Sequence, residues 1–138
     1  MSLILTKNEI GRLEEIISDN ILDSGAEHVV LTDLSGNLIM ERGSLEMEDI
    51  FSLAAVSAAN FAATAEIARL IGEEDFALLF HKGGRRNVYF SRLGKDFLII
   101  TLFNDNVSLG LIRLKIGSAI QQMATIFEDR KGAGPWRS

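Results

Sequence analysis

Apolar residues recur three and four positions apart in three segments of the chain, the spacing of one face of an α-helix. The first segment follows Thr6-Lys7-Asn8-Glu9, a capping-box sequence in which the Thr hydroxyl and the Glu carboxylate satisfy free amides of a helix start. Gly25 is placed to end that helix. The second segment runs from about Met47 to Ile71 and the third from Ser108 to about Asp129. The pattern therefore predicts three helices.

Between these helices lie short runs of β-branched, aliphatic and aromatic residues, separated by turn residues such as Asp33 to Asn37 and Lys82-Gly83-Gly84. The runs predict five strands, at residues 28–32, 38–40, 76–80, 88–90 and 97–103. Short connections favour antiparallel neighbours. We expect an α+β fold of order α-β-β-α-β-β-β-α, with one five-stranded antiparallel sheet covered by helices. Residues 1–130 form one domain in this prediction, and residues 131–138, with Trp136, form a disordered tail.

The second predicted helix, LAAVSAANFAATAEIARLIG, is apolar on two sides when it is wound at about 3.6 residues per turn. One side carries bulk and is interrupted by Asn60: Leu53, Val56, Ala63, Ile67, Leu70 and Ile71. The opposite side carries alanines ringed by larger residues: Ala54, Ala55, Ala58, Ala62 and Ala65, with Phe51, Phe61 and Arg69. We expect the bulky side to pack on the sheet and the alanine side to be a docking surface for a second chain. Alanine serving helix propensity alone is the alternative.

Composition excludes several classes of function. The net charge of −5, from 14 Lys and Arg against 19 Asp and Glu, disfavours nonspecific binding to nucleic acid or anionic lipid. The absence of cysteine removes thiol chemistry and fits a reducing compartment, so a cytoplasmic location is expected. The start of the chain lacks the basic segment of a signal peptide. The longest unbroken apolar run, FLIITLF at 97–103, has the length of a strand and not of a membrane span.

No catalytic motif is present: the sequence has no phosphate-binding G-x-x-x-x-G-K-[ST] loop, no G-x-G-x-x-G, no H-E-x-x-H and no G-x-S-x-G. The two histidines, His28 and His81, are expected to be hydrogen-bonded structural residues and not ligands or bases. The segment from Lys82 to Arg86 could cradle an anion, but a plain turn between two strands is the stronger interpretation. We predict no catalytic residue, no metal and no cofactor.

Two longer motifs carry a family resemblance. The pattern AAN-xx-ATAEIA-x-LIGE spans Ala58 to Glu73, and SLGLIRLK spans Ser108 to Lys115. With these motifs the chain resembles the Roadblock/dynein light chain family, and within it the bacterial MglB-type branch, from about Ile10 to about Phe127. Neither motif is catalytic, so the resemblance identifies a scaffold more firmly than an activity.

The resemblance implies a Roadblock/profilin-like sandwich, with helix two on one face of the sheet and helices one and three on the other. It also implies a homodimer in which the third strand pairs with its symmetry mate. That strand comprises Phe76, Ala77, Leu78, Leu79, Phe80 and His81. An apolar edge strand without a protecting charge or proline needs a partner, which agrees with this implication.

In MglB-like dimers a small Ras-like GTPase docks on the paired second helices, so the resemblance implies a partner-binding platform at Ala54, Ala55, Ala58, Ala62, Ala65 and Arg69. The MglB-like pattern has Lys where this chain has Arg69, so no arginine-finger role is carried over. The sequence therefore predicts a non-enzymatic, homodimeric regulator of a Ras-like GTPase. Two alternatives stay open: a scaffold that assembles a larger complex, and a small-molecule sensor.

Overall fold

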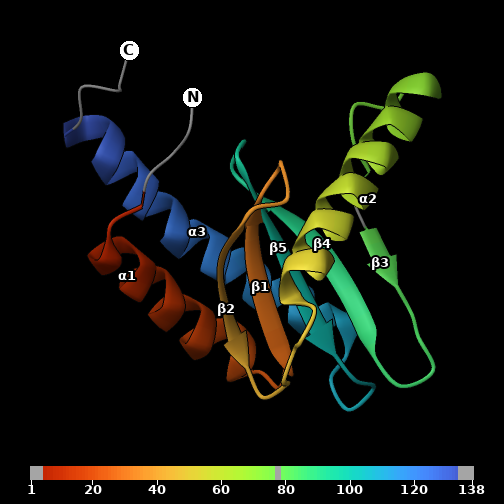
Figure 1. Ribbon diagram of the computed structural model, residues 1–138, viewed down its shortest axis with the longest axis horizontal. Helices are drawn as coiled ribbons and strands as arrows, with labels where there is room; N and C mark the ends of the chain where they lie inside the picture. The colour runs from red at the N-terminus through yellow and green to blue at the C-terminus, as the bar shows by residue number, and fades with distance from the viewer. Residues whose placement is uncertain (1–4, 77–78, 134–138) are drawn as a thin grey trace.

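The computed structural model describes residues 5–76 and 79–133, and it has the predicted order of helices and strands (Figure 1). The elements are α1 (Lys7–Ile17), the π-helical turn η1 (Ser18–Leu22), β1 (His28–Asp33), β2 (Leu38–Gly43), α2 (Ile50–Leu70), β3 (Leu79–His81), β4 (Asn87–Leu93), β5 (Phe97–Phe103) and α3 (Leu109–Ala133). The strands form one antiparallel sheet in the order β2-β1-β5-β4-β3. The predicted fold class is confirmed.

The sheet lies between two helical layers, with α1 and α3 on one face and α2 on the other (Figure 1). The larger hydrophobic cluster joins Leu13 and Ile17 of α1 to Ile112 and Ile116 of α3. The smaller cluster lies under α2 and has Ile50, Val30, Phe90, Leu98 and Ile100 as its buried members. β5 is central and covered on both faces, which explains why all seven of its residues are buried and its sequence does not alternate.

The start of α1 forms as the sequence predicts. The Thr6 hydroxyl accepts a hydrogen bond from the Glu9 amide at 3.1 Å, and the Glu9 carboxylate accepts one from the Thr6 amide at 2.8 Å. The helix then widens into η1 before Gly25, which has a φ of +110°. Gly25 therefore ends the helical segment at the predicted position, after a last turn that is π-helical.

Several predicted boundaries differ from the structure: β2 and β4 are longer than the predicted 38–40 and 88–90, and α2 begins at Ile50. β3 begins at Leu79, whereas Phe76 lies outside the strand, and Ala77 and Leu78 lie outside the described residues. α3 continues to Ala133, past the predicted end near Asp129 and into the predicted tail. The remainder of that tail, residues 134–138 with Trp136, lies outside the described residues.

The turn between β1 and β2 approaches the backbone of α2. Asp33 holds this turn, because its carboxylate accepts hydrogen bonds from the amides of Ser35 and Asn37 at 3.0 and 2.8 Å. Gly36 in the turn has a φ of +92°, and a Cβ atom there would lie 2.9 Å from the Ala55 Cα and 3.5 Å from the Ala58 Cβ. Glycine in the turn and alanine in the helix together permit this close approach.

We expect Gly36→Ala to destabilise the fold by about 2–4 kcal/mol, because it combines a positive φ with a collision against the α2 backbone. Gly94→Ala is the matched control, since Gly94 also has a positive φ, +64°, but a Cβ there meets nothing within 4 Å. Urea denaturation at one fixed protein concentration measures both variants. Equal losses of stability in the two variants would show that the approach of α2 to the turn is unimportant.

Candidate functional site

α2 packs on the sheet through its small residues. Ala54, Ser57, Ala58 and Ala68 are buried on this side, together with Ile50 at the start of the helix. The expectation that the bulky side packs on the sheet is wrong: Val56, Ile67 and Leu70 are 67%, 53% and 69% exposed, and Ile71 is exposed as well. The physical reason is that large side chains of the sheet, such as Phe90 and Leu98, already fill the space under α2. Small residues on the facing side of the helix therefore let the helix lie close to the sheet.

The six predicted platform residues divide into two groups. Ala54 and Ala58 are buried, so their assignment to an exposed docking surface is wrong, and both belong to the packing of α2 on the sheet and the β1–β2 turn. Ala55, Ala62, Ala65 and Arg69 are exposed. Arg69 is tied to Glu66 one helical turn earlier, with its Nε atom 3.0 and 3.1 Å from the two carboxylate oxygens. This hydrogen bonding lowers the pKa of Glu66.

β3 is an edge strand, as predicted. It pairs with β4 on one side, and no strand in the described part of the chain lies on its other side. The His81 ring packs edge-on against Phe90, and its Nε2 atom lies 3.4 Å from the Asn60 amide nitrogen of α2. One flank of α2 therefore lies beside β3, as the paths of the two elements in Figure 1 also show.

Three of the exposed bulky residues of α2, Val56, Ile67 and Leu70, lie on this same flank. Val56 is four residues before Asn60 and Ile67 seven residues after it, so all three share one side of the helix. The α2–β3 surface is therefore defined here as Val56, Ala63, Ile67, Leu70 and the open edge of β3. It joins exposed apolar side chains to unpaired strand backbone, the two features that isolated soluble proteins avoid.

The length and hydropathy of α2 also meet the criterion for a membrane-spanning helix. Within the described residues it is the one helix long and apolar enough to cross a membrane, with a mean hydropathy of 1.4. Alanine raises the hydropathy, while Glu66 and Arg69 lie on the exposed side and the opposite side packs on the sheet. A single helix of this kind is weak evidence for a membrane span.

Comparison with known proteins identifies the fold family. The Roadblock/LC7 domain model matches residues 13–103, about two thirds of the chain. The chain belongs to the Roadblock/LC7 family. Three solved structures agree with this assignment. MglB from Myxococcus xanthus is 33% identical, with a TM-score of 0.83 over 92% of this chain and 96% of that one. The gliding protein MglB from Thermus thermophilus is 28% identical, with a TM-score of 0.82 over 93% and 97%.

A third structure, described as MglB with a tetrameric arrangement, is 28% identical, with a TM-score of 0.83 over 93% of this chain and 96% of that one. These likenesses confirm the resemblance to the bacterial MglB-type branch. The residues that the family model matches, 13–103, include both α2 and β3.

The β3–β4 hairpin, which carries the basic segment from Lys82 to Arg86, is tied to the rest of the protein. The Lys82 ammonium lies 2.9 and 3.0 Å from the Asp105 carboxylate oxygens, and the Asn87 amide donates to the same carboxylate at 2.8 Å. Arg86 pairs with Glu27 at 3.0 Å. Lys82 and Arg86, two of the cations that would bind an anion here, are therefore already paired with carboxylates of the protein itself. This pairing favours the interpretation of the segment as a turn.

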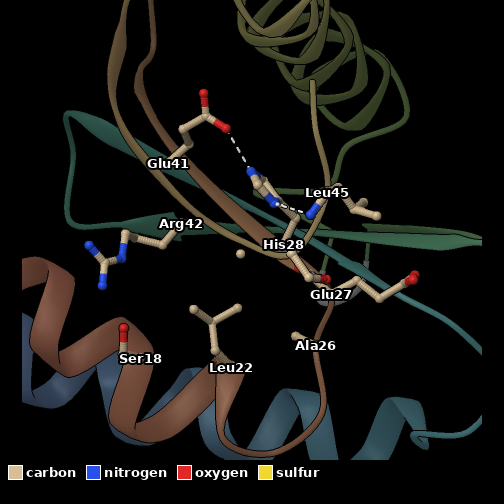
Figure 2. Close-up of a pocket in the computed structure, with 10 residues that line it drawn as sticks. Ser18, Leu22, Ala26, Glu27, His28, Glu41, Arg42 and Leu45 are labelled. Carbon is tan, nitrogen blue, oxygen red and sulfur yellow. Dashed lines mark hydrogen bonds and ion pairs between the residues drawn. The ribbon is translucent and has the colours of Figure 1, made fainter. Parts of the chain in front are cut away.

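His28 has the structural role that the sequence predicts. Its side chain is 3% exposed, its Nε2 atom lies 2.6 Å from a Glu41 carboxylate oxygen, and the Leu45 amide donates to Nδ1 at 3.3 Å (Figure 2). Because Nδ1 accepts, Nε2 carries the proton that is donated to Glu41. Both ring nitrogens are therefore in use.

An open hollow of about 670 Å³ lies beside His28, between η1 and the end of β2 (Figure 2). Its charged lining residues are paired within the protein, Glu41 with His28, Arg42 with Glu14 and Glu27 with Arg86. This pairing leaves few polar atoms for a small ligand, so the hollow gives little support to a sensor function. Within residues 5–76 and 79–133, no three His, Asp or Glu side chains gather to hold a metal ion.

We expect the contacts of Asp105 with Asn87 and Lys82 to stabilise the fold near neutral pH and to lose this effect in acid. Hydrogen bonds from Asn87 and then Lys82 hold the pKa of the Asp105 carboxyl below its ordinary value of 3.8. A carboxyl with a lowered pKa in the folded state stabilises the fold above its unfolded pKa, and this contribution is lost as the pH falls through the folded pKa. Asp105→Asn should therefore lower the Tm slightly at pH 6, and the difference from the unaltered protein should shrink below about pH 4.

Thermal unfolding between pH 6 and pH 3 measures this effect. Asp96→Asn is the control, because Asp96 is exposed in the β4–β5 turn and its side chain makes no hydrogen bond or ion pair with the described residues. A Tm difference for Asp105→Asn that stays constant down to pH 3 would contradict the ion-pair explanation.

Proposed function

We propose that this protein is a cytoplasmic, non-catalytic homodimer that regulates a small Ras-like GTPase, which it binds through α2. The observation that carries the proposal is the exposed apolar flank of α2 beside the open edge of β3. The similarity to MglB structures supports it, as does the relative whose structure is described as tetrameric. Self-association and GTPase binding use different sides of α2 in this proposal.

The dimer uses the α2–β3 surface. Antiparallel pairing of two β3 edges about a two-fold axis would satisfy the unpaired backbone groups and make one continuous sheet. The same operation brings the two α2 flanks together, so Val56 and Ile67 of each protomer leave water. Burying one such side chain contributes about 1.5–3 kcal/mol, and two-fold symmetry doubles each contribution.

The GTPase uses the side of α2 that remains exposed in this dimer. We name it the outer α2 face and define it by Phe51, Ala55, Ala59, Ala62 and Glu66, all of which are exposed. Three alanines in its middle give low relief, so a globular partner can lie across the paired helices. Phe51, at 72% exposure, supplies the large apolar side chain that protein interfaces use as an anchor.

The residues of this face favour a mechanism in which binding positions the GTPase's own residues over one in which this protein supplies a catalytic arginine. Arg69 is the arginine nearest to it on α2, and its guanidinium is held by Glu66. An arginine finger has to reach the phosphates of the partner's nucleotide. We therefore propose that binding orders the GTPase's own switch segments and so changes its rate of hydrolysis.

The dimer is tested by Ile67→Lys. Placing a charge in the α2 flank should weaken the dimer at least about tenfold, because two ammonium groups would be desolvated without partners. Leu114→Lys is the control, since Leu114 is also a large exposed residue, 68% accessible, but lies on α3 at the opposite face of the sheet. Sedimentation velocity over a concentration series measures both. A dimer that survives Ile67→Lys unchanged would refute this interface.

The partner site is tested by Ala62→Arg. We expect the variant to stay dimeric but to lose binding of Ras-like GTPases from the same genome, loaded with GDP or a nonhydrolysable GTP analogue. Gln121→Arg on the exposed side of α3 is the control for added charge. Isothermal calorimetry gives the affinities. Intact affinity in Ala62→Arg would exclude the outer α2 face, and a dimer that binds no GTPase in either state would favour the scaffold function.

A further inference from the structure

Exposed carboxylates lie at both ends of α2. Glu46, Glu48 and Asp49 precede the helix, and Glu73, Glu74 and Asp75 follow it. Among the described residues, one of the six has a basic partner, because Asp75 lies 3.9 Å from Arg92. The remaining five are exposed without an ion pair to the described residues.

The carboxylates after α2 interact unfavourably with the helix dipole. The C-terminal end of a helix carries a partial negative charge, so an acidic group beside it costs about 0.3–1 kcal/mol. Glu73 continues from this end, where its amide donates to the Ala68 carbonyl at 2.8 Å. Glu73 and Glu74 have no ion pair with the described residues that would offset this cost. Their negative charge therefore lowers the stability of the isolated protomer. A partner with basic residues at this position would remove that cost.

Between these acidic ends the outer α2 face is apolar. Phe51 and the three alanines of this face carry no charge, and Glu66 at its far end is already paired with Arg69. The guanidinium of Arg92 lies 5.8 Å from the Phe61 ring centre of α2 and is paired with Asp75. The face thus combines an uncharged centre with negative charge at each end.

Two-fold symmetry would increase this polarity. In the proposed dimer an axis perpendicular to the sheet makes the two α2 helices antiparallel, so the start of one lies beside the end of the other. Each end of the paired-helix surface would then carry both sets of carboxylates. Concentrated negative charge at both ends of the paired-helix surface attracts a positively charged partner and orients it before contact.

We propose that the GTPase partner of the outer α2 face has an apolar contact patch flanked on both sides by Lys or Arg, and that the carboxylates at the ends of α2 steer its association. This inference rests on the proposed function and adds the charge of the partner. It separates two roles on one surface: the apolar centre holds the complex together, and the acidic ends set the rate at which it forms.

The test measures the association rate constant between the full-length protein and the Ras-like GTPase, loaded with a nonhydrolysable GTP analogue, by stopped-flow fluorescence. The double variant Glu73→Gln, Glu74→Gln should slow association about three- to tenfold at low salt, with little change in dissociation. The difference should vanish near about 0.5 M salt, where screening is short-ranged. Glu15→Gln, Asp19→Asn on α1 and η1 is the matched control, because it removes the same charge from exposed positions on the opposite layer.

Sedimentation of both double variants checks that they remain dimeric. Association that is unchanged in the α2 variant, accelerated by it, or slowed equally by the control would overturn the inference while leaving the proposed function intact. Failure of the unaltered protein to form any complex would overturn the proposed function, and this inference with it.

Discussion

The close packing of α2 on the sheet is the constraint on which the rest of the structure depends. Ala54 and Ala58 are buried at this contact, and Gly36 leaves no side chain between the β1–β2 turn and the helix backbone. Larger residues at these positions would lift the helix or rotate it about its axis. Because the small residues occupy the inner side, the large apolar residues Val56, Ile67 and Leu70 are left on the outside.

That orientation of α2 gives the two faces of the sheet different roles. α1 and α3 cover one face with a continuous core, in which Ile112 and Met123 are fully buried. α2 covers the other face with a smaller core and leaves its flank open next to β3. Exposed bulk and an open strand edge would be separate liabilities in a monomer. Side by side, they form one continuous surface. In the proposed dimer a second copy covers this surface, and the outer α2 face is left for the proposed partner.

The elements themselves can be predicted from the sequence because their signals are local. The Thr6 capping box and the FLIITLF strand depend on neighbouring residues, and both occur at the predicted positions. The predicted orientation of α2 is wrong because bulk does not mark the buried side of this helix. In a helix that is apolar all round, hydrophobicity does not distinguish the sides, and the outcome depends on how much space the distant sheet leaves. Asn60, a polar residue within the bulky stripe, is the signal in the sequence that this side reaches solvent.

The central claim is that β3 is an edge in the protomer but a paired strand in the working protein. Hydrogen exchange of the β3 amides, measured by mass spectrometry from micromolar to low nanomolar protein, tests it most directly. The account predicts strong protection of β3 at high concentration and loss of that protection on dilution, while β5 exchanges slowly throughout because it is central. Rapid exchange of the outward-facing β3 amides at every concentration would contradict it.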